Sequence, residues 1–134
     1  LDTKGFAYAV IKAPEFSFSL VSLHLDFKRD SERRAQLNLV SEFIESQESG
    51  LPVVVAGDFN SAMVDSNGIL KGFVDRHELS TVGGSLPTFP STSPSRRLDD
   101  VFVCNRLEAM LKQALDIQVS DHLPLLLDVR QAVR

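Results

Sequence analysis

LPVVVAGDFNS, residues 51–61, is the stretch that decides the expected fold. Its first part, residues 51–56, has no polar side chain and is rich in valine, which is typical of a strand buried on both faces. The Gly-Asp-Phe-Asn that follows is typical of a loop at the carboxyl end of that strand. Such loops carry the chemistry of many α/β folds, because the scaffold is rigid there and the loop backbone reaches solvent. We therefore expect Asp58 and Asn60 to belong to a functional site.

A hairpin and a helix are expected before this strand. Residues 6–12 and 16–25 are rich in aromatic and β-branched side chains, and the Ala-Pro-Glu between them favours a turn. Apolar residues then recur at helical spacing until a Ser-Gly pair at 49–50, and Asp30 or Ser31 can cap the start of this helix. The order strand, helix, strand is that of a βαβ-like unit, although a hairpin-bearing sandwich would also accommodate it.

Shorter elements are expected after the central strand. Residues 68–74 favour a short helix, and residues 83–97 form an irregular stretch rich in Gly, Pro, Ser and Thr. A loop of this length in a compact domain is usually functional or disordered. The remaining expected elements are a strand over residues 98–104, a short helix over 107–115 and a strand over 125–129.

The composition of the 134 residues, 43% hydrophobic and 24% charged, is that of one globular domain. No apolar run approaches the roughly 18 residues of a membrane span, and the first residues lack a signal-peptide layout, so a soluble chain is expected. The net charge of −4 and the pI of 5.3 argue against tight, non-specific nucleic-acid binding. The single cysteine, Cys104, is expected to be a buried structural thiol; the compartment is undetermined, with a slight lean to the cytoplasm.

Polar side chains stand against apolar strands at four places. These places are His24, Asp58 with Asn60, Asp99 with Asp100, and Asp121 with His122. Taken singly, each has a structural explanation: a hydrogen-bonded histidine at a strand end, a Gly-Asp turn, an aspartate that opens a strand, and a turn or cap. Four such coincidences in one domain favour a common site instead.

Carboxylates, a carboxamide and two imidazoles are the components of a site that holds a hard divalent cation, orients a water and moves protons. Carboxylate oxygens suit Mg²⁺, for which Mn²⁺ can substitute, and a neutral amide such as Asn60 can donate to a phosphoryl oxygen without adding charge. The sequence has no cysteine cluster for zinc, no glycine-rich phosphate loop followed by lysine and no Gly-x-Ser-x-Gly elbow. The pattern therefore favours metal-assisted hydrolysis of a phosphate ester.

Several longer motifs follow one another along nearly the whole chain. They are SLHLDF at 22–27, Arg33-x-x-Gln36, VVVAGDFNS at 53–61, PTFPS at 87–91, RRLDDVFV at 96–103 and SDHLPLLLDV at 120–129. This series resembles the endonuclease/exonuclease/phosphatase superfamily, which includes pancreatic-type DNases, abasic-site endonucleases, neutral sphingomyelinases and inositol polyphosphate 5-phosphatases. The resemblance implies an α/β (α+β) fold that is half of a four-layered α/β sandwich: one mainly antiparallel sheet with helices on one face.

The resemblance also implies a role for each matching residue. Asp58 would orient or activate the attacking water, and Asn60 would hold the scissile phosphate. His122 would act as general base or transition-state stabiliser, and Asp99 would pair with it. His24 would act as general acid or bind phosphate, as the second histidine of the DNase-like and sphingomyelinase-like branches does.

Four further positions complete the set that the resemblance implies. Asp121 and Asp58 would lie by the metal ion and its waters. Arg33 and Gln36 would be structural and tie the helix to the site loop, although a solvated helix face would also explain them. Asp100 stands where an aromatic residue is common in the superfamily, so Asp99 is expected to be the functional carboxylate of the pair.

Superfamily members carry an N-terminal half of comparable length with an Asn and a Glu that is the principal metal ligand, and neither motif precedes Leu1. We therefore expect residues 1–134 to be the C-terminal portion of one domain whose N-terminal half is absent. The free sheet face would then pack on that half or self-associate. An alternative is a catalytically inactive fragment or an interaction module of the same fold.

The expected partner is a phosphate-ester substrate: a nucleic acid, a phospholipid or a small phosphodiester. The acidic charge and the motif around His24 favour a DNase-like or sphingomyelinase-like diester over an abasic site. A purely nucleic-acid-binding module is disfavoured, because the chain is acidic and lacks an aromatic, basic face.

Overall fold

The fold is described by a computed structural model that covers residues 4–62, 68–82 and 86–133. Part of the expected loop over residues 83–97 lies outside the described residues. The elements are β1 (Phe6–Lys12), β2 (Ser17–His24), α1 (Asp30–Ser46), β3 (Val53–Asp58), α2 (Ile69–Arg76), β4 (Leu79–Thr81), β5 (Asp99–Cys104), β6 (Leu107–Ala114) and β7 (Leu125–Gln131).

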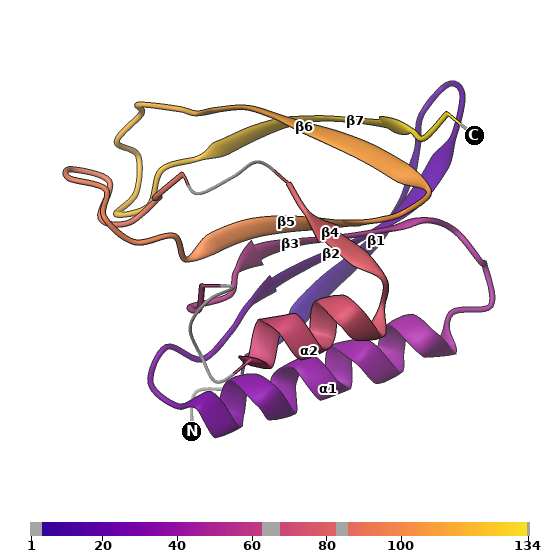
Figure 1. The fold of residues 1–134 in the computed structure, drawn as a ribbon, viewed down its shortest axis with the longest axis horizontal. Coiled ribbons are helices and arrows are strands. Elements are labelled where there is room, and N and C mark those ends of the chain that lie inside the picture. The colour runs from indigo at the N-terminus through magenta and orange to yellow at the C-terminus, as the bar shows by residue number, and fades with distance from the viewer. Residues whose placement is uncertain (1–3, 63–67, 83–85, 134) are drawn as a thin grey trace.

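Five of the strands form one mixed, mainly antiparallel sheet in the order β1-β2-β3-β5-β4 (Figure 1). β2 and β3 are parallel and are joined by α1, whereas the other neighbours are antiparallel. The predicted hairpin and βαβ-like unit are therefore confirmed. Strand β4 was not expected, because its three residues are too short to show a period.

The short helix expected over residues 107–115 is wrong, because this segment is strand β6, which pairs with β7 in a separate two-stranded sheet. Glu108, Ala109, Met110 and Leu111 are good helix formers, which explains the error. Their burial nevertheless alternates with the period of a strand: Ala109 and Leu111 are half-buried, while Glu108 and Met110 are exposed. Pairing with β7 overrides the local preference.

Both described helices cover one face of the five-stranded sheet (Figure 1). The core of this face contains Val21, Val55 and Phe102, which are cross-strand neighbours, and the apolar side of α1, including Leu37 and Val40. The expected helix cap is wrong: α1 begins at Asp30 with Arg29 in the N-cap position, whose side chain makes no capping hydrogen bond.

The β6–β7 pair lies on the opposite side of the sheet from the helices (Figure 1). It covers only part of that face. Val101 and Val103 of β5, which point to this side, are buried, and the inward residues of β6 and β7 pack against the same core. Ala7 and Ala9 of β1 and Ser22 of β2 point to the same side and are exposed.

Two further expectations concern single features. Cys104 is buried and free, as predicted. None of the helices in the described ranges is both long and apolar enough to cross a membrane.

Candidate active site

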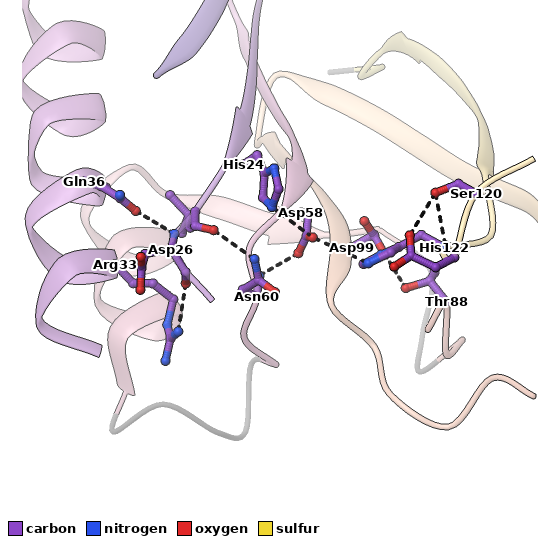
Figure 2. Close-up of polar contacts among 12 residues, drawn as sticks. His24, Asp26, Arg33, Gln36, Asp58, Asn60, Thr88, Asp99, Ser120 and His122 are labelled. Atoms are coloured by element: carbon purple, nitrogen blue, oxygen red, sulfur yellow. Dashed lines mark hydrogen bonds and ion pairs between the residues drawn. The ribbon is translucent and has the colours of Figure 1, made fainter. Parts of the chain in front are cut away.

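The register of the sheet places three of the expected site residues in one row. His24 at the end of β2 pairs with Asp58 at the end of β3, and Asp58 pairs with Asp99 at the start of β5. Paired residues of neighbouring strands share a face, so all three side chains point away from the helices. His24 Nε2 lies 3.5 Å from Asp58 Oδ2 (Figure 2). The site is thus built on strand ends, and Asp58 belongs to β3 itself and not to the loop after it.

Gly57 allows β3 to keep this register beside β2. Its φ is +146°, and a Cβ atom there would lie 1.9 Å from the carbonyl oxygen of Leu23. Any other residue would push the two backbones apart or force a strained conformation. The Gly-Asp pair of the central motif therefore has a structural reason: the glycine permits the close strand pairing that sets the position of Asp58.

His122 completes the site from the loop before β7. Its Nδ1 lies 2.6 Å from Asp99 Oδ2, and its Nε2 lies 3.7 Å from Asp58 Oδ2 (Figure 2). The three side chains are partly buried, each with about a fifth of its surface exposed, whereas His24 is 57% exposed. Because Asp99 is a hydrogen-bond acceptor, Nδ1 of His122 carries the proton and Nε2 faces Asp58.

Thr88 is a site residue that the sequence reasoning missed. Its hydroxyl donates to Asp99 Oδ2, the oxygen that also meets His122, and its side chain is fully buried. Its carbonyl accepts from Leu123 N at 2.8 Å, and the ring of Phe89 packs at 4.9 Å from the ring of His122. The PTFPS motif contains both residues and was the sequence signal that could have pointed to them. The spacing of residues along the chain does not show that the loop of this motif packs against the loop that carries His122.

Burial and neighbouring charges shift the pKa values of two site residues. Burial raises the pKa of the Asp58 carboxyl above its ordinary value of 3.8, and the charge of Asp99 raises it further, against the backbone hydrogen bond from Asn60 and the two histidines. Burial alone would lower the pKa of His122, but the hydrogen bond and the charge of Asp99 outweigh it, so the pKa lies above 6.5.

Asn60 links the central strand to the loop after β2. Its backbone, at φ of +47°, donates to Asp58 Oδ1 at 2.8 Å, and its side-chain amide donates to the carbonyl of Leu25 at 2.8 Å. These two bonds orient the carboxylate of Asp58 and leave the amide oxygen of Asn60 unused by them.

Arg33 and Gln36 brace the same loop from α1. Arg33 Nη1 donates to the carbonyl of Asp26 and Gln36 Oε1 accepts from its backbone N–H, both at 2.8 Å, and Arg33 also pairs with Asp30 (Figure 2). Arg33 is 7% exposed. These contacts are those of a helix tied to the site loop; a solvated helix face does not describe them.

Asp121 and Asp100 lie apart from the row. Asp121 is exposed, accepts a hydrogen bond from the hydroxyl of Ser120 and lines the same cavity as the row. Asp100 points to the helix side, where it pairs with Arg97 at 2.6 Å and accepts from Thr81. The choice of Asp99 over Asp100 for the site is thus consistent with the direction of the two side chains.

The site cavity offers several ligand groups to a hard divalent cation, and Asp121 is among them. Ligand atoms of Asp58, Asp99 and His122 lie within 4.8 Å of one another and line a cavity of about 660 Å³. Burial and the charge of Asp99 raise the pKa of the Asp58 carboxyl. A hard divalent cation beside these carboxylates would offset their charge.

Comparisons with known proteins place this arrangement in a family. The uncharacterized protein YbhP of Escherichia coli K12 is 33% identical over 132 residues, which cover 92% of this chain and 51% of that protein. The chain thus spans about half the length of the curated relatives it matches.

Two solved structures share the fold at lower identity. A mannosyl-6-phosphatase of Bacteroides thetaiotaomicron superposes with a TM-score of 0.68 at 22% identity, covering 87% of this chain and 52% of that one. The endonuclease domain of the retrotransposon TRAS1 superposes with a TM-score of 0.71 at 17% identity, covering 93% of this chain and 63% of that one. The model of the "Endonuclease/Exonuclease/phosphatase family" matches residues 2–122. The chain therefore belongs to the endonuclease/exonuclease/phosphatase family.

Proposed function

We propose that this chain carries most of the site of a divalent-metal-dependent hydrolase that cleaves a phosphate ester by in-line attack of an activated water. One observation carries the proposal: Asp99 holds His122 so that its free nitrogen faces the carboxylate of Asp58, 3.7 Å away. A base, an orienting carboxylate and a second carboxylate then surround one point of the cavity, which is the arrangement that activation of a water requires.

His122 and Asp99 act as a pair in this proposal. Asp99 fixes the tautomer of His122 and stabilises the imidazolium that forms when Nε2 accepts a proton. The raised pKa of His122 suits it to hold that proton near neutral pH. Asp58 orients the water with its Oδ2, while its Oδ1 is held by the backbone of Asn60.

Asn60 and His24 are proposed to hold the phosphate. The amide of Asn60 lines the cavity and adds no negative charge beside the carboxylates. His24 is the most exposed member of the row, so it can exchange protons with solvent and donate one to the leaving group.

Asp58 and Asp121 are proposed to hold Mg²⁺, or Mn²⁺ in its place. When bound, the ion would polarise the phosphoryl oxygens and offset the charge of the carboxylates. Asp99 is engaged by Thr88 and His122, which leaves the other two carboxylates of the cavity for this role.

The names of two structural relatives, one a phosphatase and the other an endonuclease, support a phosphate ester as the class of substrate. We propose a nucleic acid, a phospholipid or a small phosphodiester. The test assays the intact protein against bis-p-nitrophenyl phosphate, a lipid phosphodiester and plasmid DNA, with Mg²⁺ and with a chelator. Asp58→Asn and the chelator should each abolish hydrolysis, and Asp75→Asn, an exposed aspartate of α2, should not. Full activity after both treatments would contradict the proposal.

The uncovered part of the sheet favours a second role for this chain as one layer of a larger domain. Ala7, Ala9 and Ser22 are exposed on a face whose other half is buried under β6 and β7. We propose that residues 1–134 form the C-terminal portion of one domain and that this area packs on a preceding half or on a second copy. Sedimentation of the 134-residue chain tests the second case: association that Ala9→Glu weakens is expected, and a monomer at all concentrations contradicts self-association.

A further inference from the structure

A second cavity of about 480 Å³ adjoins the proposed site. It shares Phe27, Asn60, Arg96 and Leu98 with the site cavity, and its remaining lining is mostly polar, with Arg33 and Arg97 among it. We call it the arginine pocket. Because the two cavities share these residues, one substrate could place a phosphate at the site and a second group in the arginine pocket.

The three arginines of this pocket differ in their partners. Arg33 is paired with Asp30, and Arg97 is paired with Asp100 at 2.6 Å. Arg96 has no carboxylate partner among the described residues; its guanidinium lies 6.0 Å from the centre of the Phe89 ring. Among the described residues, Arg96 is thus the arginine of this pocket without a carboxylate partner, and it lines both cavities.

The backbone of Arg96 is held in place beside the site. Its N–H donates to the carbonyl of Phe89 at 2.9 Å, and its own carbonyl accepts from Phe89 N at 3.0 Å. Phe89 in turn packs on His122. The backbone of Arg96 is thus linked to the proposed base through Phe89, while its side chain is exposed and able to meet a ligand.

We propose that Arg96 is a specificity-determining residue that binds a second anionic group of the substrate, so that phosphate esters carrying a second phosphate are preferred. The inference rests on the proposed function. Asp58, Asp99 and Asp121 line the site cavity and repel a second anion there. The guanidinium offers a planar, permanently charged fork that matches the oxygens of a phosphate.

The binding test needs no hydrolysis. Calorimetry compares adenosine 3′,5′-bisphosphate with adenosine 5′-monophosphate on the intact protein, on Arg96→Gln and on Arg34→Gln, an exposed arginine of α1 outside both cavities. Wild type and Arg34→Gln should bind the bisphosphate about tenfold more tightly than the monophosphate, the range of one charged hydrogen-bonding contact. Arg96→Gln should lose this preference. An equal ratio in all three proteins, or no preference in wild type, overturns the proposal.

A parallel comparison of glucose 1,6-bisphosphate with glucose 6-phosphate distinguishes a nucleotide from a sugar phosphate as the source of the second group. The pair with the larger Arg96-dependent ratio identifies it. If the protein hydrolyses no phosphate ester but keeps an Arg96-dependent preference, the proposed function fails and only the binding of the second phosphate by Arg96 stands. If it hydrolyses esters and Arg96→Gln leaves the preference unchanged, only this inference fails.

Discussion

Two adjacent carboxylates at the start of β5 face opposite sides of the same sheet, and their surroundings differ. On the helix side, Asp100 is buried with Arg97 and Thr81. On the other side, Asp99 meets His122 and Thr88 at the edge of an open cavity. Each carboxylate has one basic partner and one threonine hydroxyl, so the two clusters are matched in composition.

The basic partner makes the difference between the clusters. Burial raises the pKa of Asp100, and Arg97 opposes that rise with a charge that does not titrate in the range of protein stability. His122 can gain or lose its proton near neutral pH. The helix-side cluster is therefore suited to stability alone, whereas the cavity-side cluster can move a proton. Substitutions on the two sides should separate activity from stability.

The largest effect is expected for His122→Ala on the cavity side. Loss of a positioned base should lower kcat/KM by about 10³-fold, or about 4 kcal/mol of transition-state stabilisation. The His122 side chain is about a fifth exposed at the edge of the cavity, so its removal should lower the melting temperature by less than removal of Arg97 from its buried ion pair. Steady-state hydrolysis by the intact protein with Mg²⁺ measures the first quantity and calorimetry the second. If His122→Ala kept activity within threefold of wild type, the cavity-side cluster would not differ from the helix-side cluster in having a catalytic role.

Arg97→Ala should act in the opposite way. It leaves the buried carboxylate of Asp100 without its cationic partner, which should lower the free energy of unfolding by about 3 kcal/mol. This value is at the lower end of the range for a buried ion pair, because a fifth of the Arg97 side chain is exposed. Urea denaturation measures the loss. The control is Arg76→Ala, which breaks an exposed pair with Glu45 and should cost much less. Equal losses for the two variants would show that the helix-side pair is not structural.

Thr88→Val and Thr81→Val compare the two hydroxyls at constant side-chain shape. Thr88→Val removes a donor to Asp99 and should lower kcat/KM by about tenfold, the value of one lost hydrogen bond to a charged group. The pH at which activity falls should also shift, because Asp99 then holds His122 differently. Thr81→Val removes a donor to Asp100 and should lower stability without this shift. A pH profile of kcat for both variants checks the pair.

The smallest effect concerns stability against pH. The pKa of His122 is raised in the folded protein, so its contribution to stability is fully present below 6.5 and is lost as the pH rises through the folded pKa. The difference in free energy of unfolding between wild type and His122→Asn should therefore shrink with rising pH. Burial lowers the pKa of His77, so the difference for His77→Asn should grow instead until the pH passes 6.5. Parallel slopes for the two histidines would contradict both assignments.

Most elements of the fold could be predicted from the sequence, because local patterns encode them. The aromatic and β-branched content of the hairpin strands, the helical spacing of α1 and the apolar run of β3 each need only neighbouring residues. The prediction of a helix over residues 107–115 was wrong because these residues favour a helix locally, and pairing with strand β7 makes them a strand. The missed role of Thr88 has the same origin, since its hydrogen bond reaches a residue 11 positions away.

The sequence by itself determined which chemical groups this protein has at its strand ends: the carboxylates, the amide and the imidazoles of the motifs, with the glycine that lets β3 approach β2. Only the tertiary structure decided which of them meet. The row from His24 to Asp99 exists because three strands pair in one register, and His122 joins it across 23 positions of the chain. Residue types and periods are local properties, whereas strand register and loop packing are set by the burial of the whole core, which no short stretch of sequence contains.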